Sequence, residues 1–362
     1  MSVSFIPGTV DVAPEVLAAQ ARPVIPHHSK EFEELYHSVV ERLQNLFNTK
    51  NPLFLIPGTA TVVQEAGIRN FASARILACV NGAFSSRWSK IAEANGKRID
   101  RLDVSHNEII HPDLLADALD GRLYDAVTIV HNETASGIVN PVRELAAVVR
   151  DISPDTLVLV DAVSSLGGME IKMDEWGIDY LITVSYNCLA LPPGLAFAAV
   201  SERALDQAAK VSDRGWFTDF LLWEKSRLQD STPVIPSVTQ IYALDMQLNR
   251  ILAEGVQNRF ARHAEIATRV QTWAQENDMP PFAPADVRSP TVTALQNTRV
   301  FDFDDLNQFL IDRGMRIGRG YGTLREKTFR IAHMGEIMMK DAEILLSALD
   351  EFFKLSRGST RL

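Results

Sequence analysis

Short apolar runs alternate with amphipathic stretches from about residue 50 onward, and this alternation constrains the fold more than any other feature of the sequence. The runs have the length and β-rich composition of strands that are buried on both faces. They cover residues 52–56, 76–80, 99–104, 126–131, 156–161, 180–185 and 195–200. Strands that alternate with helices form a mostly parallel sheet with right-handed crossovers, so the predicted fold class is α/β.

The ends of these strands indicate where a ligand would bind. In open sheets of this class, ligands lie beyond the carboxyl ends of the strands. The turns after Ile56, His131, Asp161 and Ser185 are therefore the places where the sequence predicts a binding site.

The C-terminal part of the chain predicts a second, smaller α+β unit. Residues 238–277 read as a long helical stretch, because apolar residues recur at spacings of three and four. Prolines then break the pattern, and strand-like residues 291–295 and 328–333 alternate with helix-like residues 306–313 and 341–353. We expect an N-terminal segment of residues 1–20, a large domain of residues 21–255 and a small domain of residues 256–362.

The composition excludes several classes of partner. The chain has 362 residues, is 46% hydrophobic and carries a formal net charge of −10, which is typical of a soluble globular protein. Neither nucleic acid nor an anionic membrane attracts such a chain, and the apolar runs are too short to span a bilayer. Two cysteines in apolar segments and an N-terminus without a signal-peptide pattern predict a cytoplasmic protein. The histidines follow no metal-ligand spacing, so no metal site is expected.

Several motifs follow the predicted strands. They are HNETASG at residues 131–137, DAVSSLGG at 161–168 and PPGLAF at 192–197, with FRIAHMG at 329–335 and Pro7-Gly8 near the start. Together they resemble the class V aminotransferases, which are fold type I pyridoxal-phosphate enzymes, and within them the alanine–glyoxylate and serine–glyoxylate (serine–pyruvate) subgroup. The resemblance runs from about residue 5 to 355. It implies a large PLP-transferase domain, a smaller α+β domain, an amino acid or keto acid ligand, and a homodimer.

Taken residue by residue, the resemblance implies a pocket for the cofactor ring and for a substrate. Asp161 would lie against the pyridine nitrogen and keep the ring protonated, so that it accepts electrons. Phe84 and Val163 would cover the two faces of the ring, and Thr134 would reach the ring hydroxyl or the substrate. Arg330 would bind the substrate carboxylate through a bidentate fork.

The resemblance also implies a phosphate-binding cup. Gly58, Thr59 and Ala60 would offer donors at a helix N-terminus, which favours anions. Ser185 and Tyr186, beside the next strand end, would complete the cofactor contacts.

Asn187 departs from the family at the most important position. The family reads Gly-Ser-Gln-Lys just before Pro-Pro-Gly, and that lysine forms the Schiff base, whereas residues 184–187 here read VSYN. An amide is neither a nucleophile toward the aldehyde nor a base near neutral pH. We therefore expect that ordinary transamination is lost, and that pyridoxal phosphate or pyridoxamine phosphate, if bound at all, is held non-covalently.

Further departures lie at other cofactor contacts. Val184, Tyr186, Pro57 and Ile235 each replace a residue that the family uses near the phosphate or next to the lysine. Dispersed changes favour natural divergence over one deliberate replacement. Four interpretations stay open: lysine-independent chemistry with the amine form of the cofactor, binding of a different ring or carboxylate ligand, a transaminase whose lysine was deliberately replaced, and a pseudoenzyme that binds a small ligand or regulates a partner.

Overall fold

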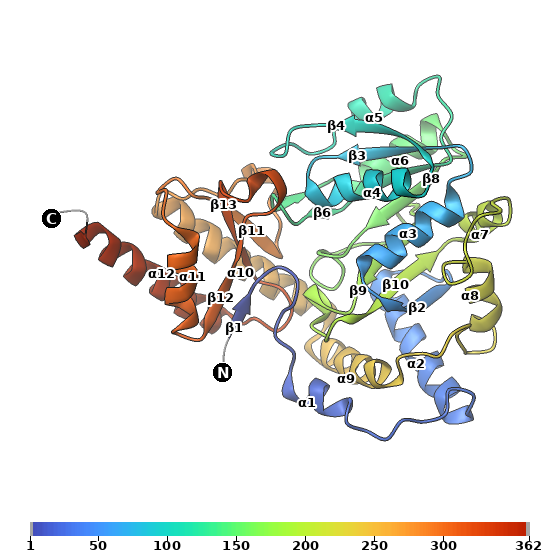
Figure 1. Ribbon diagram of the computed structural model, residues 1–362, viewed down its shortest axis with the longest axis horizontal. Helices are drawn as coiled ribbons and strands as arrows, with labels where there is room; N and C mark the ends of the chain where they lie inside the picture. Colours follow the sequence, from blue (N-terminus) through green and yellow to red (C-terminus); the bar gives the residue numbers. More distant parts are fainter. Residues whose placement is uncertain (1–2, 360–362) are drawn as a thin grey trace.

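The computed structural model describes residues 3–359, with side chains through residue 355. It forms two lobes of unequal size, each with its own sheet (Figure 1). Residues 1–2 of the predicted N-terminal segment and residues 360–362 of the predicted small domain lie outside the described residues.

The larger lobe contains a seven-stranded sheet. Its strand order is β2 (Leu53–Gly58), β10 (Gly194–Val200), β9 (Tyr180–Val184), β8 (Leu157–Asp161), β5 (Ala126–Val130), β3 (Arg75–Val80) and β4 (Arg98–Asp103). Strand β10 runs antiparallel to both of its neighbours, and the pairs from β9 through β4 are parallel. The predicted α/β fold with a mostly parallel sheet is therefore confirmed.

Helices cover both faces of this sheet because its residues alternate between the faces. Phe54 and Ile56 pack into a core with α3 (Ala60–Phe71), α4 (Ala83–Ala94), α7 (Glu202–Ala208) and α8 (Phe220–Arg227). Leu53 and Leu55 pack into a second core on the other face. That core includes α1 (Pro14–Ala19), α2 (Lys30–Phe47), α5 (Pro112–Leu119), α6 (Val142–Ile152) and α9 (Val238–Glu254).

The smaller lobe contains a four-stranded sheet in the order β1 (Val3–Phe5), β12 (Met315–Arg319), β13 (Thr328–Ala332) and β11 (Val292–Gln296). Its core is shared with α10 (Val256–Glu276), α11 (Phe303–Ile311) and α12 (Met339–Ser359). The first strand of the chain pairs in parallel with β12, so β1 belongs to the smaller lobe, and the chain then crosses to α1 beside the larger one (Figure 1).

The predicted helical stretch over residues 238–277 is helical on both sides of one break. The stretch is two helices, because Gly255 separates α9 from α10 with a φ of 84°. A residue with a Cβ adopts this left-handed conformation only at a cost, so glycine ends the first helix here. Among the described residues, no helix combines the length and the apolarity that crossing a membrane requires.

Candidate ligand-binding site

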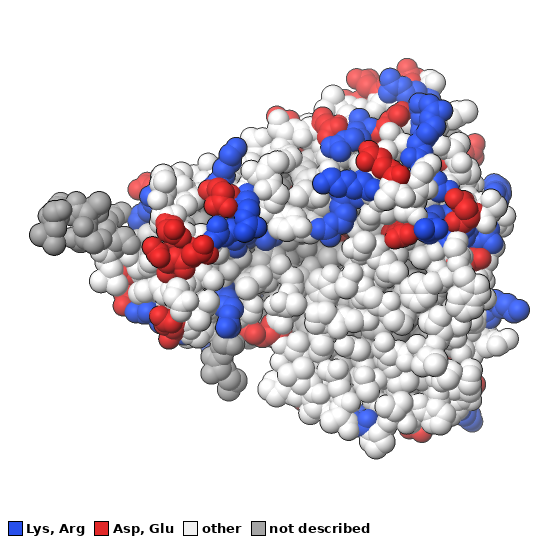
Figure 2. Space-filling model, viewed as in Figure 1, with Lys and Arg blue, Asp and Glu red and all other residues white. Residues whose placement is uncertain are grey.

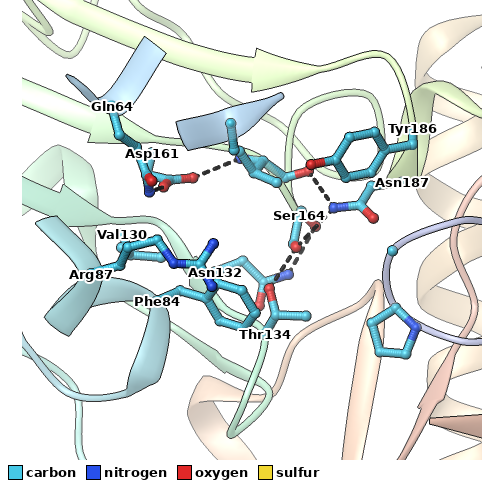
Figure 3. Close-up of a pocket in the computed structure, with 14 residues that line it drawn as sticks. Gln64, Phe84, Arg87, Val130, Asn132, Thr134, Asp161, Ser164, Tyr186 and Asn187 are labelled. Atoms are coloured by element: carbon cyan, nitrogen blue, oxygen red, sulfur yellow. Dashed lines mark hydrogen bonds between the residues drawn. The ribbon is translucent and has the colours of Figure 1, made fainter. Parts of the chain in front are cut away.

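One pocket lies at the carboxyl edge of the seven-stranded sheet (Figure 3). Seven of the predicted site residues line it: Ala60, Phe84, Thr134, Asp161, Val163, Tyr186 and Asn187. The sheet explains why they meet, because β8 ends at Asp161, β9 ends three residues before Asn187, and α3 and α4 begin just after β2 and β3. Gly58, Thr59, Ser185 and Arg330 do not belong to the pocket lining.

Asp161 is a buried carboxylate with three donors around it. Its Oδ2 accepts hydrogen bonds from Gln64 Nε2 at 2.8 Å and from Trp88 Nε1 at 3.2 Å. Its Oδ1 accepts the backbone N–H of Val163 at 3.0 Å. Burial raises the pKa of Asp161, and these hydrogen bonds oppose that rise. The carboxylate is thus rigidly held, and its spare lone pairs can accept a donor from a ligand.

Asn187 is held by its amide nitrogen. Nδ2 donates to the carbonyl of Val163 at 2.9 Å and to Ser164 Oγ at 3.2 Å. Ser164 Oγ in turn shares a 2.6 Å hydrogen bond with Thr134 Oγ1. The backbone N–H of Asn187 donates to the carbonyl of Gly8 at 3.2 Å, which brings the N-terminal segment against the pocket.

Phe84 lies in the first turn of α4, and Glu133 fixes that turn. The Glu133 carboxylate, on the short strand β6 (Asn132–Glu133), accepts the backbone N–H of Phe84 and of Ser85 as well as the Ser85 hydroxyl. An anion at a helix N-terminus is favoured by the unpaired N–H groups and by the helix dipole. Burial raises the pKa of Glu133, while its hydrogen bonds oppose the rise. Glu133 is a positioning residue to which the motif gave no role.

Tyr186 lies at the N-terminus of α3. Burial raises the pKa of its phenol, and the nearby backbone N–H of Ala60 opposes that rise. The hydroxyl of the N-cap residue Thr59 makes no capping hydrogen bond. Tyr186 and Ala60 both line the pocket, so the phenol lies on the side of the pocket where the resemblance implies a phosphate.

Two other residues of the predicted cup shape the backbone instead. Gly58 turns the chain from β2 into α3 with a φ of 148°, and a Cβ there would lie 2.7 Å from Val62 Cγ1. Ser185 Oγ donates to the carbonyl of Pro192 at 2.8 Å and so closes the loop that carries Asn187.

Arg330 is a buried cation beside the pocket. Its Nε donates to the carbonyl of Arg319 at 2.9 Å, and its guanidinium packs over the Tyr321 ring at 5.5 Å. Among the described residues, no carboxylate lies within ion-pairing distance of it. Burial lowers the pKa of Arg330 to about 10, which leaves the group charged at neutral pH. A buried cation without a partner favours binding of a carboxylate.

Three carboxamide side chains line the pocket with an unpaired oxygen. Gln64 Oε1, Asn132 Oδ1 and Asn187 Oδ1 are fully enclosed and accept no hydrogen bond from the described residues. In each case the amide nitrogen has a protein acceptor, which fixes the orientation of the amide. A buried polar atom without a partner costs about 1–3 kcal/mol.

The motifs gave no role to several lining residues, among them Gln64 and Arg87. Gln64 lies one turn after Ala60 on α3, and Arg87 lies three residues after Phe84 on α4, so helical spacing could have placed them. Arg87 Nη2 donates to Tyr321 Oη at 3.1 Å, and its guanidinium packs over the Phe84 ring at 5.0 Å.

Comparison with known proteins identifies the family. Residues 15–334 match the model of the family described as aminotransferase class-V. The chain is 36% identical to an uncharacterised aminotransferase of Methanocaldococcus jannaschii, over 96% of this chain and 91% of the relative. It is 30% identical to the pyridoxamine–pyruvate transaminase of Mesorhizobium japonicum, over 92% of this chain and 86% of that protein.

Solved structures agree with the sequence comparison. The crystal structure of an alanine–glyoxylate aminotransferase from Nostoc sp. superposes with a TM-score of 0.92 at 25% identity, over 97% of this chain and 94% of the other. The chain therefore belongs to the class V aminotransferase family, and it is similar to that family's alanine–glyoxylate and serine–glyoxylate aminotransferases.

Proposed function

We propose that this protein binds a planar ring ligand and a carboxylate in the family's site without attaching either one covalently. The observation that carries the proposal is the chemistry of the pocket lining. Among the described residues that line the pocket there is no lysine, and Asn187 stands where the resemblance implies one. An amide cannot form the Schiff base on which transamination by the usual route depends.

Pyridoxal phosphate is the cofactor that family membership implies, and the residues present fit its ring but not its covalent attachment. Asp161 is available to a protonated ring nitrogen, and Phe84 and Val163 both line the space beside it. The attachment point is absent, and Tyr186 lines the pocket together with Ala60, at the helix N-terminus that would hold the phosphate. For this reason we propose reversible binding and derive no catalytic step through the cofactor.

Arg330 supports the carboxylate half of the proposal. Its guanidinium has donors to spare, since the protein engages Nε through the Arg319 carbonyl and Nη1 only through a 3.4 Å contact with the Thr134 carbonyl. A bidentate carboxylate would satisfy the remaining donors and offset a buried charge. This fits an amino acid or keto acid ligand, the substrates of the family.

The proposal includes a homodimer, as in the family. Few charged side chains appear in Figure 2 over the half of the larger lobe where α2, α8 and α9 lie. Leu228, directly after α8, is 70% exposed, and Ile235, just before α9, is 77% exposed. An apolar face of this kind is typical of an interface between subunits.

The test is a reductive trapping experiment. Wild-type protein and the variant Asn187→Lys are incubated with pyridoxal phosphate, treated with borohydride and analysed by peptide mass spectrometry. We expect a stable adduct on the peptide that contains residue 187 in the variant, and no adduct on any pocket residue in the wild type. An adduct on a pocket residue of the wild-type protein would show that another amine serves as the attachment point and would overturn the proposal.

A further inference from the structure

We propose that a cavity between α4 and the loop after β12 is a second anion site, which takes a phosphate group with two negative charges. The inference goes beyond the proposed function, because this outer cavity is distinct from the ring pocket. Among the described residues only Arg87 lines both spaces. The wall of the outer cavity comes from residues of 80–106 in the larger lobe and of 321–323 in the smaller one. Its volume is about 450 Å³, far more than a single water molecule occupies, so a polyatomic anion fits.

The lining of the outer cavity carries an excess of positive charge. Arg87, Lys90 and Arg101 contribute three cations, whereas Asp103 is the one carboxylate among the described residues that line it. The chain as a whole has a formal net charge of −10, so this lining has the opposite sign to the protein. Figure 2 shows Lys and Arg side chains gathered over α4 beside the hollow between the lobes. A recess lined by one sign of charge raises the local concentration of counter-ions.

Several donors in this lining are not used by the protein. The Lys90 ammonium makes no hydrogen bond or ion pair within the described part of the chain. Arg101 binds both oxygens of Asp103 through Nε and Nη2, and its Nη1 has only a 3.4 Å contact with Ser86 Oγ. An oxyanion accepts hydrogen bonds at several oxygens and can satisfy such donors together.

Two hydrogen bonds between the lobes fix the shape of the outer cavity. Arg87 Nη2 donates to Tyr321 Oη at 3.1 Å, and Thr323 Oγ1 shares a 3.0 Å hydrogen bond with His106 Nδ1. The Tyr321 ring also stacks on Phe84, with 5.0 Å between the ring centroids. Figure 3 shows Arg87 beside Phe84 at the inner pocket. The cations of the larger lobe are therefore held against a wall from the smaller lobe, and a bound anion would contact both lobes.

The charge of the lining favours a dianion over a univalent anion. Three cations and one carboxylate leave an excess that a single negative charge does not balance. A phosphate group carries close to two negative charges above pH 7 and offers at least three acceptor oxygens. Free phosphate and a phosphate ester of a small organic molecule share this chemistry.

Isothermal titration calorimetry with three probes tests the inference. The purified protein, dialysed free of small anions, is titrated at pH 8 with inorganic phosphate, glycerol 3-phosphate and dimethyl phosphate. We expect saturable binding of the two dianions, and binding of dimethyl phosphate to be about ten-fold or more weaker, because it carries one charge. Tighter binding of glycerol 3-phosphate than of inorganic phosphate supports an ester as the ligand, and the reverse order supports the free ion.

Charge variants assign the bound phosphate to the outer cavity. Lys90→Gln/Arg101→Gln removes two exposed cations, so the phosphate affinity should fall about ten-fold or more. Asp103→Asn removes the exposed carboxylate and should raise the affinity about three-fold, a gain that misfolding does not produce. The matched control Arg122→Gln/Lys210→Gln removes two exposed cations that do not line the cavity, and the affinity should stay within about two-fold.

The outcomes separate this inference from the proposed function. Equal phosphate affinity in the wild type, the double variant at 90 and 101, and Asp103→Asn would mean that phosphate binds elsewhere and would overturn the inference. The absence of saturable binding of both dianions also overturns it, and equal affinity for dimethyl phosphate contradicts the dianion. None of these results bears on the proposed function, whose test is the adduct at residue 187.

Discussion

Asn187 combines an unusual backbone conformation with a fixed side chain. Its φ is 60°, in the left-handed region, and Ala190 at the end of the same short turn has a φ of 53°. Asparagine tolerates this region better than most residues that have a Cβ. The conformation is kept in place by the amide hydrogen bonds to Val163 and Ser164 and by the backbone bond to Gly8.

Two substitutions at this residue separate the backbone from the side chain. Asn187→Ala and Asn187→Gly both remove the amide hydrogen bonds, but only alanine is strained at positive φ. We expect the alanine variant to be less stable than the glycine variant by about 1 kcal/mol, measured as the free energy of unfolding in urea. Equal stability of the two variants would mean that the turn relaxes when the amide is removed, and that the left-handed conformation is not imposed by its surroundings.

At the scale of elements, the N-terminus of α4 depends on a close contact between Gly82 and Glu133. A Cβ on Gly82 would lie 2.7 Å from Glu133 Oε2, so no larger residue fits while the carboxylate caps the helix. The cap holds the turn that carries Phe84. We therefore expect affinity for the ring ligand to depend on Gly82, which does not line the ring pocket.

The variant Gly82→Ala tests this link against a matched steric change. On the helix face that packs on β9, Gly67 of α3 is equally crowded, since a Cβ there would lie 2.6 Å from Tyr180 Cε1. We expect both alanine variants to lose about 1–3 kcal/mol of stability. Only Gly82→Ala should weaken binding of the ring ligand, as measured by calorimetry on the folded fraction. A similar loss of affinity in Gly67→Ala would show that the effect is general destabilisation.

At the scale of the whole molecule, the sequence predicted the strands of the large sheet better than the side-chain contacts within the site. Strands recognised from apolar runs placed Asp161 and Asn187 at one edge, because strand ends meet wherever strands are parallel. Gln64 was missed because its partner Asp161 is 97 residues away, and no local pattern reports such a contact. The apolar spacing of residues 238–277 did not by itself indicate the break at Gly255, since an isolated glycine within a helical pattern is ordinarily tolerated.

Two buried histidines make the stability of the whole molecule depend on pH. Burial lowers the pKa of His131, at the end of β5, and of His333, after β13, from 6.5 to about 4. A lowered pKa means that the unfolded chain takes up protons first, so stability is fully present above pH 6.5 and is lost as the pH falls toward 4. Each histidine contributes about 3 kcal/mol to this loss.

The variant His131→Gln should flatten this acid dependence. A neutral amide takes up no proton, so we expect the variant to lose about 2–3 kcal/mol less stability than the wild type between neutral pH and the acid end of the window. Urea unfolding at a series of pH values measures the difference, with the exposed His111→Gln as the control. Parallel pH curves for wild type and His131→Gln would contradict the assignment.

Because β1 pairs with β12, the pocket can form only after the ribosome has synthesised β12. Pro7 and Gly8, which line it, follow a strand made at the start of synthesis, but that strand pairs with residues 315–317. A nascent chain therefore carries the strand ends of the site long before it can complete the pocket wall. We therefore expect a product that stops short of β12 to bind the proposed ligand more weakly than the whole chain, because the strand before Pro7 and Gly8 then lacks its partner.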